Sequence, residues 1–431
     1  MPFEWRSYAS LSKISMGCCY TKRPCSPSNT RLEDFSLVRS IGKGAFGKVC
    51  IVYNKAMKKH YALKYMSKRR LVCKNHNVLR ELEILKELSH TFIVNLYFTF
   101  QDESYIFMVS DLLLGGDLEY HLKNGKFSEP RLKLYICEIA LAIDYLQQHQ
   151  IMHRDIKPAN LLLDEKGHVH LTDFNLATKL EPNSLATSFS GTKPYMAPEI
   201  LGTHLGVING YGLWVDFWSL GITFFECLRG RQPYDFSGNT TPNQMLAMIM
   251  NEAYLIPANW CSDLVSFIKC LLHIDIDKRI TSFDAFKAHR YMQRMDFDAI
   301  LSRQISPIFV PKQRLNCDLA FELEERIVES SPLHKHYRRK QHKKHACNSS
   351  SAVASAETAT QSSHNVLLDD AIQDLSNSFV EYNRFLAARQ NTLVSEQPTN
   401  CSQTSSSNLP DKNCPASKSN KQLLKKTRSV R

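Results

Sequence analysis

The sequence predicts an α+β fold, in which a small, mainly antiparallel β lobe with one key helix precedes a larger, mainly helical lobe. Strand-like segments dominate up to residue 113, at 49–53, 61–64, 96–100 and 105–109. Helical patterns dominate afterwards, and Arg131–Gln148 is amphipathic. The 431 residues are enough for roughly two to three domains.

The key helix of the first lobe is predicted at Asn77–Leu88. Its apolar residues recur every three to four positions, as expected for one buried helix face, at Val78, Leu82, Leu85 and Leu88. Glu81 lies off this face. Strands 96–100 and 105–109 follow the helix and complete the predicted lobe.

Composition narrows the class of protein only in part. The net charge of +12 permits contact with nucleic acid, anionic lipid or acidic proteins without choosing among them. The 13 cysteines form no CxxC pair and no zinc-ligand spacing, so reduced thiols are expected. We expect no bilayer-spanning segment, and the first residues lack the pattern of a secretory signal.

Residues 1–34 are rich in Ser, Cys and Pro and are predicted to be disordered. Within them, Met16–Thr21 fits the N-myristoylation pattern, with two cysteines placed for palmitoylation. In the chain as numbered from Met1, this glycine is internal and cannot be acylated. Two interpretations stay open: translation from Met16 that gives a doubly acylated, membrane-anchored form, or a chance match.

A glycine-rich segment at 41–49 has the pattern G-x-G-x-x-G-x-V. Glycines of this kind let backbone amides approach phosphate oxygens closely. The pattern alone also fits a dinucleotide-binding turn, which should open a helix. Here strand 49–53 follows instead, which favours a phosphate-binding loop between strands; its residues are Ile41, Gly42, Lys43, Gly44, Ala45, Phe46, Gly47, Lys48 and Val49.

The stretch His153–Asn175 places four polar residues within a short span: Asp155, Lys157, Asn160 and Asp173. The apolar run 161–163, a Lys-Gly turn and the alternating segment 168–172 predict a small hairpin. Such a hairpin would bring Asn160 and Asp173 together at its open end, as two ligands of a shared Mg²⁺ require. Asp155 precedes the hairpin, free to face an incoming hydroxyl.

This stretch resembles the catalytic and metal-binding loops of protein kinases, H-R-D-x-x-x-x-N followed by D-F-G. Residues 35–292, with a flank to about 345, are similar to the YANK kinases of the AGC group. The matching segments are Ile41–Ile51 (IGKGAFGKVCI), Met108–Leu118 (MVSDLLLGGDL), Asp173–Asn175 (DFN), Gly191–Glu199 (GTKPYMAPE) and Arg314–Glu325 (RLNCDLAFELEE).

The resemblance implies a bilobal protein-kinase fold, with the small lobe at 35–113 and the large lobe at 114–292. It also implies a serine/threonine protein kinase that transfers the γ-phosphate of ATP to protein hydroxyls in intracellular signalling. Mg²⁺ is the expected metal, with Mn²⁺ as the alternative. The rival interpretation is a pseudokinase-like, nucleotide-binding scaffold with little turnover.

Residue roles follow from the same resemblance. Asp155 accepts the proton of the substrate hydroxyl, and Lys157, typical of the serine/threonine class, steadies the γ-phosphate. Asn160 and Asp173 hold the metal. Lys64, paired with Glu81, holds the α- and β-phosphates. The other residues implied to bind ATP are Ala62, the gatekeeper Ser110, the hinge residues Asp111 and Leu113, then Asp117 and Leu162, together with the glycine-rich loop.

Structural and regulatory roles are also implied. His153 and Phe174 match a stacked apolar spine, Asp216 bonds the backbone of the catalytic loop, and Thr192 bonds Asp155 and Lys157. Glu199 is expected to pair with Arg279. Ser188 stands at the usual activating phosphosite with Arg154 as phosphate partner, although Asn77 and Thr178 replace two further basic partners. Whether Ser188 is phosphorylated stays open.

Asn175 departs from the general protein-kinase pattern, whereas Ser110, Ala159 and the longer start depart from the YANK kinases. Asn175 replaces the glycine of D-F-G, and Asn is among the residues that best tolerate left-handed backbone geometry after Gly. It is therefore compatible with catalysis. Ser110 is small for a gatekeeper. Ala159 replaces an acidic residue, which puts a preference for basic substrates in doubt, although Asp117 and Glu226 remain acidic.

Beyond the kinase-like region, 293–345 resembles a kinase tail and contains the basic run 334–345. Residues 346–431 are predicted to be mostly disordered, with one amphipathic helix near 366–389. This helix is expected either to dock on its own kinase domain or to self-associate. We expect a monomeric, cytoplasmic protein that binds ATP and protein substrates and no specific nucleic acid. A plasma-membrane association would require acylation from the Met16 start.

Overall fold

The computed structural model describes residues 30–43, 47–74, 78–251, 253–312 and 358–395. The chain divides into two compact units, and the second begins at Arg389, inside the last helix. No helix within the described ranges is both long and apolar enough to cross a membrane. The predicted acylation site at 16–21, the basic run 334–345 and the segment 314–325 lie outside the described residues.

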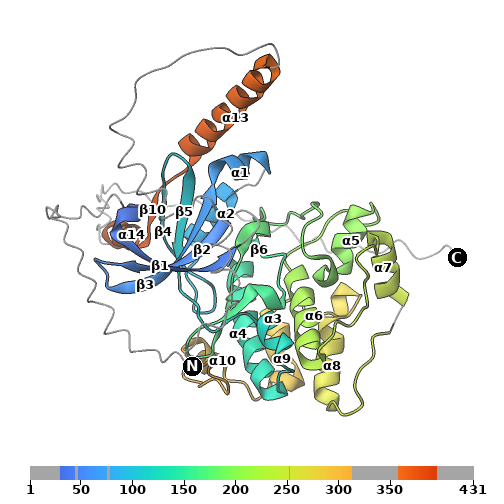
Figure 1. Ribbon diagram of the computed structural model, residues 1–431. Coiled ribbons are helices and arrows are strands. Elements are labelled where there is room, and N and C mark those ends of the chain that lie inside the picture. Colours follow the sequence, from blue (N-terminus) through green and yellow to red (C-terminus); the bar gives the residue numbers. More distant parts are fainter. Residues whose placement is uncertain (1–29, 44–46, 75–77, 252, 313–357, 396–431) are drawn as a thin grey trace, which may run out of the picture. The chain divides into compact units, whose positions relative to one another are not determined.

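The small lobe is built on an antiparallel sheet (Figure 1). Its strand order is β1-β2-β3-β5-β4-β10, so the tail supplies the last strand. One sheet face buries aromatic and aliphatic residues such as Phe35, Tyr61 and Phe107. The first five strands are β1 (Phe35–Lys43), β2 (Gly47–Asn54), β3 (Lys59–Ser67), β4 (Leu96–Gln101) and β5 (Tyr105–Ser110).

Two helices connect β3 to β4, namely α1 (Lys68–Cys73) and α2 (Val78–Glu87). The predicted apolar face of α2 is buried, and Val78, Leu82 and Leu85 are each no more than 6% exposed. Glu81 is also buried, although it carries a charge. A buried carboxylate needs a partner, and this one points to the interior of the cleft described below.

The large lobe is mainly helical and surrounds the long helices α4 and α6 (Figure 1). Both carry nearly continuous runs of buried residues, as helices packed on several sides must. The helices of this lobe are α3 (Leu118–Lys123), α4 (Glu129–Gln148), α5 (Pro198–His204), α6 (Val215–Arg229), α7 (Pro242–Asn251), α8 (Ser262–Leu271), α9 (Phe283–Ala288) and α10 (Phe297–Leu301).

Two short antiparallel pairs lie where the lobes meet. The hairpin predicted from the alternation at 168–172 is present as β7 (Leu161–Leu163) and β8 (Val169–Leu171). A second pair joins β6 (Ile151–Met152) to β9 (Thr178–Lys179). Short 3-10 turns lie at Leu32–Asp34, Pro158–Asn160, Phe174–Leu176, Lys193–Tyr195, Ile276–Lys278 and Arg290–Met292.

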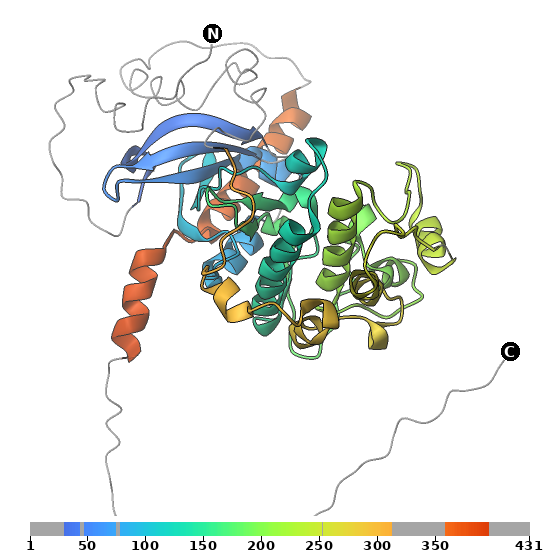
Figure 2. The same ribbon diagram turned by 90° about the horizontal axis from the view of Figure 1, so that it is seen from below.

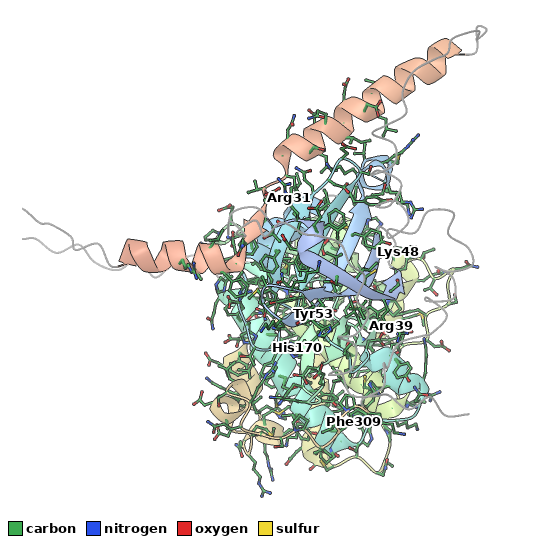
Figure 3. The ribbon with its side chains drawn as sticks, turned by 60° about the vertical axis from the view of Figure 1, so that its left-hand side comes forward. Arg31, Arg39, Lys48, Tyr53, His170 and Phe309 are labelled. Atoms are coloured by element: carbon green, nitrogen blue, oxygen red, sulfur yellow. The ribbon has the colours of Figure 1, made fainter. Side chains whose placement is uncertain are left out.

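The segment after α10 returns along the large lobe. Arg303 donates hydrogen bonds to the Asp164 carboxylate over 3.2 Å and to Nε2 of His170 over 2.9 Å. Phe309, which is labelled in Figure 3, packs on Arg131. The guanidinium carbon of Arg131 lies 3.6 Å from the centroid of the Phe309 ring. These contacts fasten residues 303–309 to the β7–β8 hairpin and to α4.

The C-terminal segment differs from the single helix expected at 366–389. It forms α13 (Thr358–Ser378), the short strand β10 (Tyr382–Asn383) and α14 (Arg384–Ser395). Between the helices, Phe379 is 6% exposed within the main core, and β10 pairs antiparallel with β4. The hydrogen bonds between β10 and the edge strand β4 and the burial of the Phe379 ring offset the free energy lost by interrupting the helix.

The tail therefore docks on the small lobe of its own chain (Figure 2), where α13 lies beside α1 (Figure 1). The Lys68 ammonium donates to the Ser376 hydroxyl over 2.8 Å, and Lys86 of α2 donates to the Val380 carbonyl over 2.9 Å. Arg384 donates to the backbone carbonyls of Leu88 and Leu96. Hydrogen bonds of residues before and after Phe379 thus connect the tail to the small lobe.

Replacing Phe379 with Ala should release the tail from β4. Loss of a buried phenyl group costs about 3 kcal/mol in typical cores, more than a two-residue strand is expected to recover. We expect faster hydrogen exchange in β4 and β10 of Phe379→Ala, measured by mass spectrometry. Val380→Ala, at a side chain that is 65% exposed, is the matched control. Unchanged exchange in Phe379→Ala would show that the ring does not hold the tail.

Candidate active site

A cleft of about 360 Å³ lies at the junction of the two lobes. Most of the residues predicted to bind ATP or metal line it, from both lobes. Those are Ile41, Gly47, Val49, Ala62, Lys64, Glu81, Ser110, Asp111, Leu113, Leu162 and Asp173. The structure adds residues that were not predicted there as ligands: Leu85, Val94, Leu96, Met108, Thr172, Phe174 and Asn175.

The glycine-rich hairpin forms one wall of the cleft through Ile41, Gly47 and Val49. At Gly47 a side chain would not fit, because a Cβ atom would lie 2.3 Å from the carbonyl oxygen of Tyr65. Gly42, Lys43 and Lys48 belong to the same pair of strands, where Lys43 pairs with Lys48. The predicted residues Gly44, Ala45 and Phe46 lie outside the described part of the chain.

Lys64 and Glu81 form an ion pair in the cleft, with 2.8 Å between Nζ and Oε1. Burial alone would lower the pKa of Lys64, but the carboxylates of Glu81 and Asp173 outweigh burial and raise it. For the Glu81 carboxyl, burial raises the pKa, and the positive charge of Lys64 opposes this shift without cancelling it. The ammonium is therefore firmly charged, and it is fixed between strand β3 and helix α2.

Asp155 is the centre of a hydrogen-bond network below the cleft. Lys157 donates to Asp155 Oδ2 over 2.8 Å and to the Thr192 hydroxyl over 2.7 Å. Thr192 in turn donates to Asp155 Oδ1 from both its hydroxyl and its backbone N–H. Burial would raise the pKa of Asp155, but the bonds from Lys157 and Thr192 outweigh it and lower the pKa. The carboxylate is thus ionised at neutral pH.

Asn160 and Asp173 flank the open end of the β7–β8 hairpin, as predicted. The backbone N–H of Thr172, next to Asp173, donates to the Asn160 carbonyl over 2.9 Å. The Asn160 amide donates to the backbone carbonyl and to Oδ2 of Asp155, over 2.8 and 3.0 Å. Asp173 has left-handed backbone geometry with φ 65°, and its carboxylate accepts a hydrogen bond from the Asn175 amide.

Buried groups position these loops. Asp216 of α6 accepts hydrogen bonds from the backbone N–H groups of His153 and Arg154, each over 2.8 Å. The His153 ring packs edge-on against Phe174, with 4.8 Å between centroids. Burial lowers the pKa of His153, so its ring is neutral at physiological pH. The two loops therefore share one rigid support in the large lobe.

Ser188 lies against Arg154, whose guanidinium donates to the serine hydroxyl over 2.6 Å. The Tyr211 hydroxyl donates to the Ser188 carbonyl over the same distance of 2.6 Å. Arg80 of α2 lies within electrostatic range of Arg154, because burial and then the positive charge of Arg154 lower the pKa of Arg80. The sequence pattern did not indicate this second cation. It indicated only that Asn77, which lies outside the described residues, and Thr178 replace two basic partners.

Glu199 and Arg279 form a buried, two-pronged ion pair in the large lobe. Nη1 and Nη2 of Arg279 donate to the two Glu199 oxygens over 2.6 and 3.1 Å. The side chains are 3% and 0% exposed. This contact fixes the start of α5, and with it the end of the segment that carries Ser188 and Thr192.

Two residues predicted to contact ATP, Asp111 and Asp117, use their carboxylates to bond other groups of the protein. The Asp111 carboxylate accepts hydrogen bonds from Asn95 and from the Tyr97 hydroxyl, and the Asp111 backbone N–H donates to the Asn95 carbonyl over 3.1 Å. Asp117 caps helix α3 by accepting from the backbone N–H of Tyr120 over 2.7 Å. Capping is a common use of Asp at this position of a helix, and nothing in the sequence distinguished it from a ligand role.

Comparison with known proteins decides the family. The sequence pattern that defines the protein kinase domain matches residues 35–292. The chain belongs to the protein kinase family. Human serine/threonine-protein kinase 32B is 45% identical over 83% of this chain and 85% of its own length. Mouse serine/threonine-protein kinase 32C is 42% identical over 92% and 80%, and Protein kinase 2 of Dictyostelium discoideum is 37% identical over 67% and 60%.

These relatives confirm the resemblance to the YANK kinases, and the predicted bilobal kinase fold is confirmed as well. The protein is a serine/threonine kinase, and no finding favours a pseudokinase. As a member of this family it uses ATP and a divalent metal ion, and it acts on protein substrates.

The residues of the cleft fit these ligands. Apolar side chains from both lobes, including Val49, Ala62 and Leu162, leave a space suited to a flat heterocycle. Gly47 allows close approach of the backbone, and Lys64 supplies a fixed positive charge for phosphate oxygens. Carboxylate and amide oxygens of Asp173 and Asn160 suit a hard divalent cation.

Proposed function

We propose that this kinase uses Asp155 to orient and deprotonate a serine or threonine hydroxyl, and that its metal is Mg²⁺. The hydrogen-bond network at Asp155 carries this proposal. Its carboxylate is ionised, and Lys157 and Thr192 hold it in place from two sides. A fixed, ionised carboxylate can accept the proton of a hydroxyl that enters beside it.

Lys157 has two functions in this proposal. Its ammonium bridges Asp155 and Thr192, and it is 22% exposed, so one face remains accessible to a bound phosphate. A cation at this place steadies negative charge on the transferring group and keeps the base oriented. Thr192 extends the same network to the segment that carries Ser188.

At the other end of the cleft, Lys64 would hold the α- and β-phosphates, with Glu81 fixing the ammonium. Asn160 and Asp173 would hold Mg²⁺, and Ile41, Val49, Ala62, Leu113 and Leu162 would enclose the adenine. When bound, the metal neutralises charge on the phosphate oxygens. The residues themselves act by position and charge, since none forms a covalent bond with the phosphate.

We further propose that phosphorylation of Ser188 strengthens the active arrangement. Arg154 already contacts the serine hydroxyl, and Arg80 adds a second positive charge from α2. A phosphate there would gain charge-assisted hydrogen bonds that join α2 to the catalytic loop. Glu81, on the same helix, would be steadied by this link.

For the rest of the protein, we propose that the kinase acts as a monomer in the cytoplasm. Docking of α13 and β10 on the chain's own small lobe supports the first part. Attachment to the plasma membrane would follow only from translation starting at Met16. Mass spectrometry of the cellular N-terminus tests this, and a protein that begins at residue 1 or 2 without lipid would exclude it.

The change Asp155→Ala tests the proposed mechanism. General base catalysis contributes about 10²-fold or more to such reactions, so kcat should fall at least that far while ATP still binds. The measurement is phosphate transfer to a peptide array by the purified full-length protein. Asp277→Ala, at an exposed surface turn, should keep normal activity. An Asp155→Ala enzyme as active as the parent would instead show that Asp155 is not the catalytic base.

Ser188→Ala tests the regulatory proposal. It removes the phosphate and the bonds to Arg154, each worth about 2 kcal/mol at a charged group, so kcat of enzyme isolated from cells should fall about tenfold. Ser184→Ala, in an exposed turn of the same segment, is the control. Equal activity of all three proteins, with phosphate detected on Ser188 of the parent, would refute the proposal.

A further inference from the structure

Asn175, which follows Asp173 and Phe174 in the chain, extends its side chain into the cleft. Asn175 lines the cavity between Lys64 and Asp173. Its amide nitrogen donates to Oδ1 of Asp173, and its amide oxygen accepts from the Lys64 ammonium over 3.4 Å. The general protein-kinase pattern D-F-G has glycine at this position, and glycine can make neither contact. The departure therefore places a new polar group at the centre of the site.

We propose that Asn175 is a positioning residue, whose amide ties the Asp173 carboxylate to Lys64 and presents the second Asp173 oxygen to the metal. The proposal rests on the function proposed above, in which Asp173 binds Mg²⁺. Within the described part of the chain, the Asn175 amide is the hydrogen-bond donor found on this carboxylate. Its action is on the orientation of the ligand, and it takes no part in the chemical step.

The backbone shows why such a tie matters. Asp173 adopts left-handed geometry, with φ 65° and ψ 76°, and Asn175 follows in a single 3-10 turn. A non-glycine residue held in this region costs about 1 kcal/mol or more. The bond from Asn175 runs back to Asp173 across that turn, so it offsets part of the cost. Phe174, between them, is 1% exposed and anchors the turn in the core.

The charges in the cleft favour an amide over other polar groups. Lys64 already lies near two carboxylates, those of Glu81 and Asp173. A third carboxylate at 175 would repel both, whereas a neutral amide donates to one carboxylate and accepts from the ammonium. A series of polar contacts thus links α2, β3 and the metal-binding loop without adding charge. It runs from Glu81 through Lys64 and Asn175 to Asp173.

The consequence is an effect on metal affinity. Mg²⁺ and Mn²⁺ bind carboxylate oxygens in a nearly octahedral arrangement that requires well-oriented ligands. Hydrogen bonds to a ligating carboxylate typically change metal affinity by about 10- to 100-fold. Asn175 should therefore lower the metal concentration at which the kinase is saturated, with a smaller effect on kcat at saturating metal.

The experiment measures Mn²⁺ binding to the full-length protein in the presence of ADP, from the paramagnetic resonance signal of free Mn²⁺. We expect Asn175→Gly to bind Mn²⁺ about tenfold more weakly. Asn175→Ser should lie between Asn175→Gly and the parent, because a hydroxyl makes the same kind of local bond more weakly. Asn183→Gly is the matched control, an exposed Asn with φ 62° in the following segment.

Equal Mn²⁺ affinity in Asn175→Gly and the parent would overturn the proposal. If Asn175→Gly fails to fold, Asn175→Ser decides, and parental affinity in that variant counts against the proposal. Asp173→Asn separates this proposal from the proposed function. If Asp173→Asn loses Mn²⁺ while Asn175→Gly keeps it, only the role of Asn175 fails. If Asp173→Asn binds Mn²⁺ normally, the metal assignment itself is wrong.

Discussion

The Lys64 ammonium lies between two carboxylates from different parts of the chain, and the geometry of the cleft depends on this arrangement. Glu81 reaches it from α2, 2.8 Å away, and Asp173 acts on it from the loop after β8. A buried charge is costly unless it is paired. Removing either Lys64 or Glu81 would therefore leave the other charge buried without its partner. The ion pair also connects α2 to β3.

Below the cleft, a second set of bonds positions the catalytic loop. Asp216 holds the backbone of His153 and Arg154, and Asp155 is fixed by Lys157 and Thr192. The two sets meet at the β7–β8 hairpin, where the backbone N–H of Thr172, next to Asp173, donates to the Asn160 carbonyl. Phosphate-binding and proton-accepting groups are thus supported separately but share one hairpin.

Much of this arrangement could be predicted from the sequence, because local patterns determine it. Alternation at 168–172 predicted the hairpin, and the spacing in 77–88 predicted the buried face of α2. Side-chain direction is less predictable. The Asp111 carboxylate accepts a hydrogen bond from the Tyr97 hydroxyl, and the Asp117 carboxylate caps helix α3. The left-handed geometry considered for Asn175 falls on Asp173 instead, and no sequence signal indicated the contacts of the Asn175 amide.

The tail was the least predictable part. Periodicity at 368–386 continued through Phe379–Asn383, where the chain leaves the helix to pair with β4. Only the three-dimensional edge of the sheet explains this break, since no local signal marks a two-residue strand. Its contacts reach α2 through Lys86, so the tail helps to hold the helix that carries Glu81.

The most direct test of the account is the affinity of Glu81→Gln for ATP and for adenosine, measured by calorimetry with Mg²⁺ present. Loss of the charged partner of Lys64 costs about 1.5 kcal/mol, so ATP should bind about tenfold more weakly. Adenosine, which lacks phosphates, should bind as it does to the parent protein. Equal affinities of Glu81→Gln and the parent for ATP would contradict the claim that this pair fixes the phosphate-binding cation.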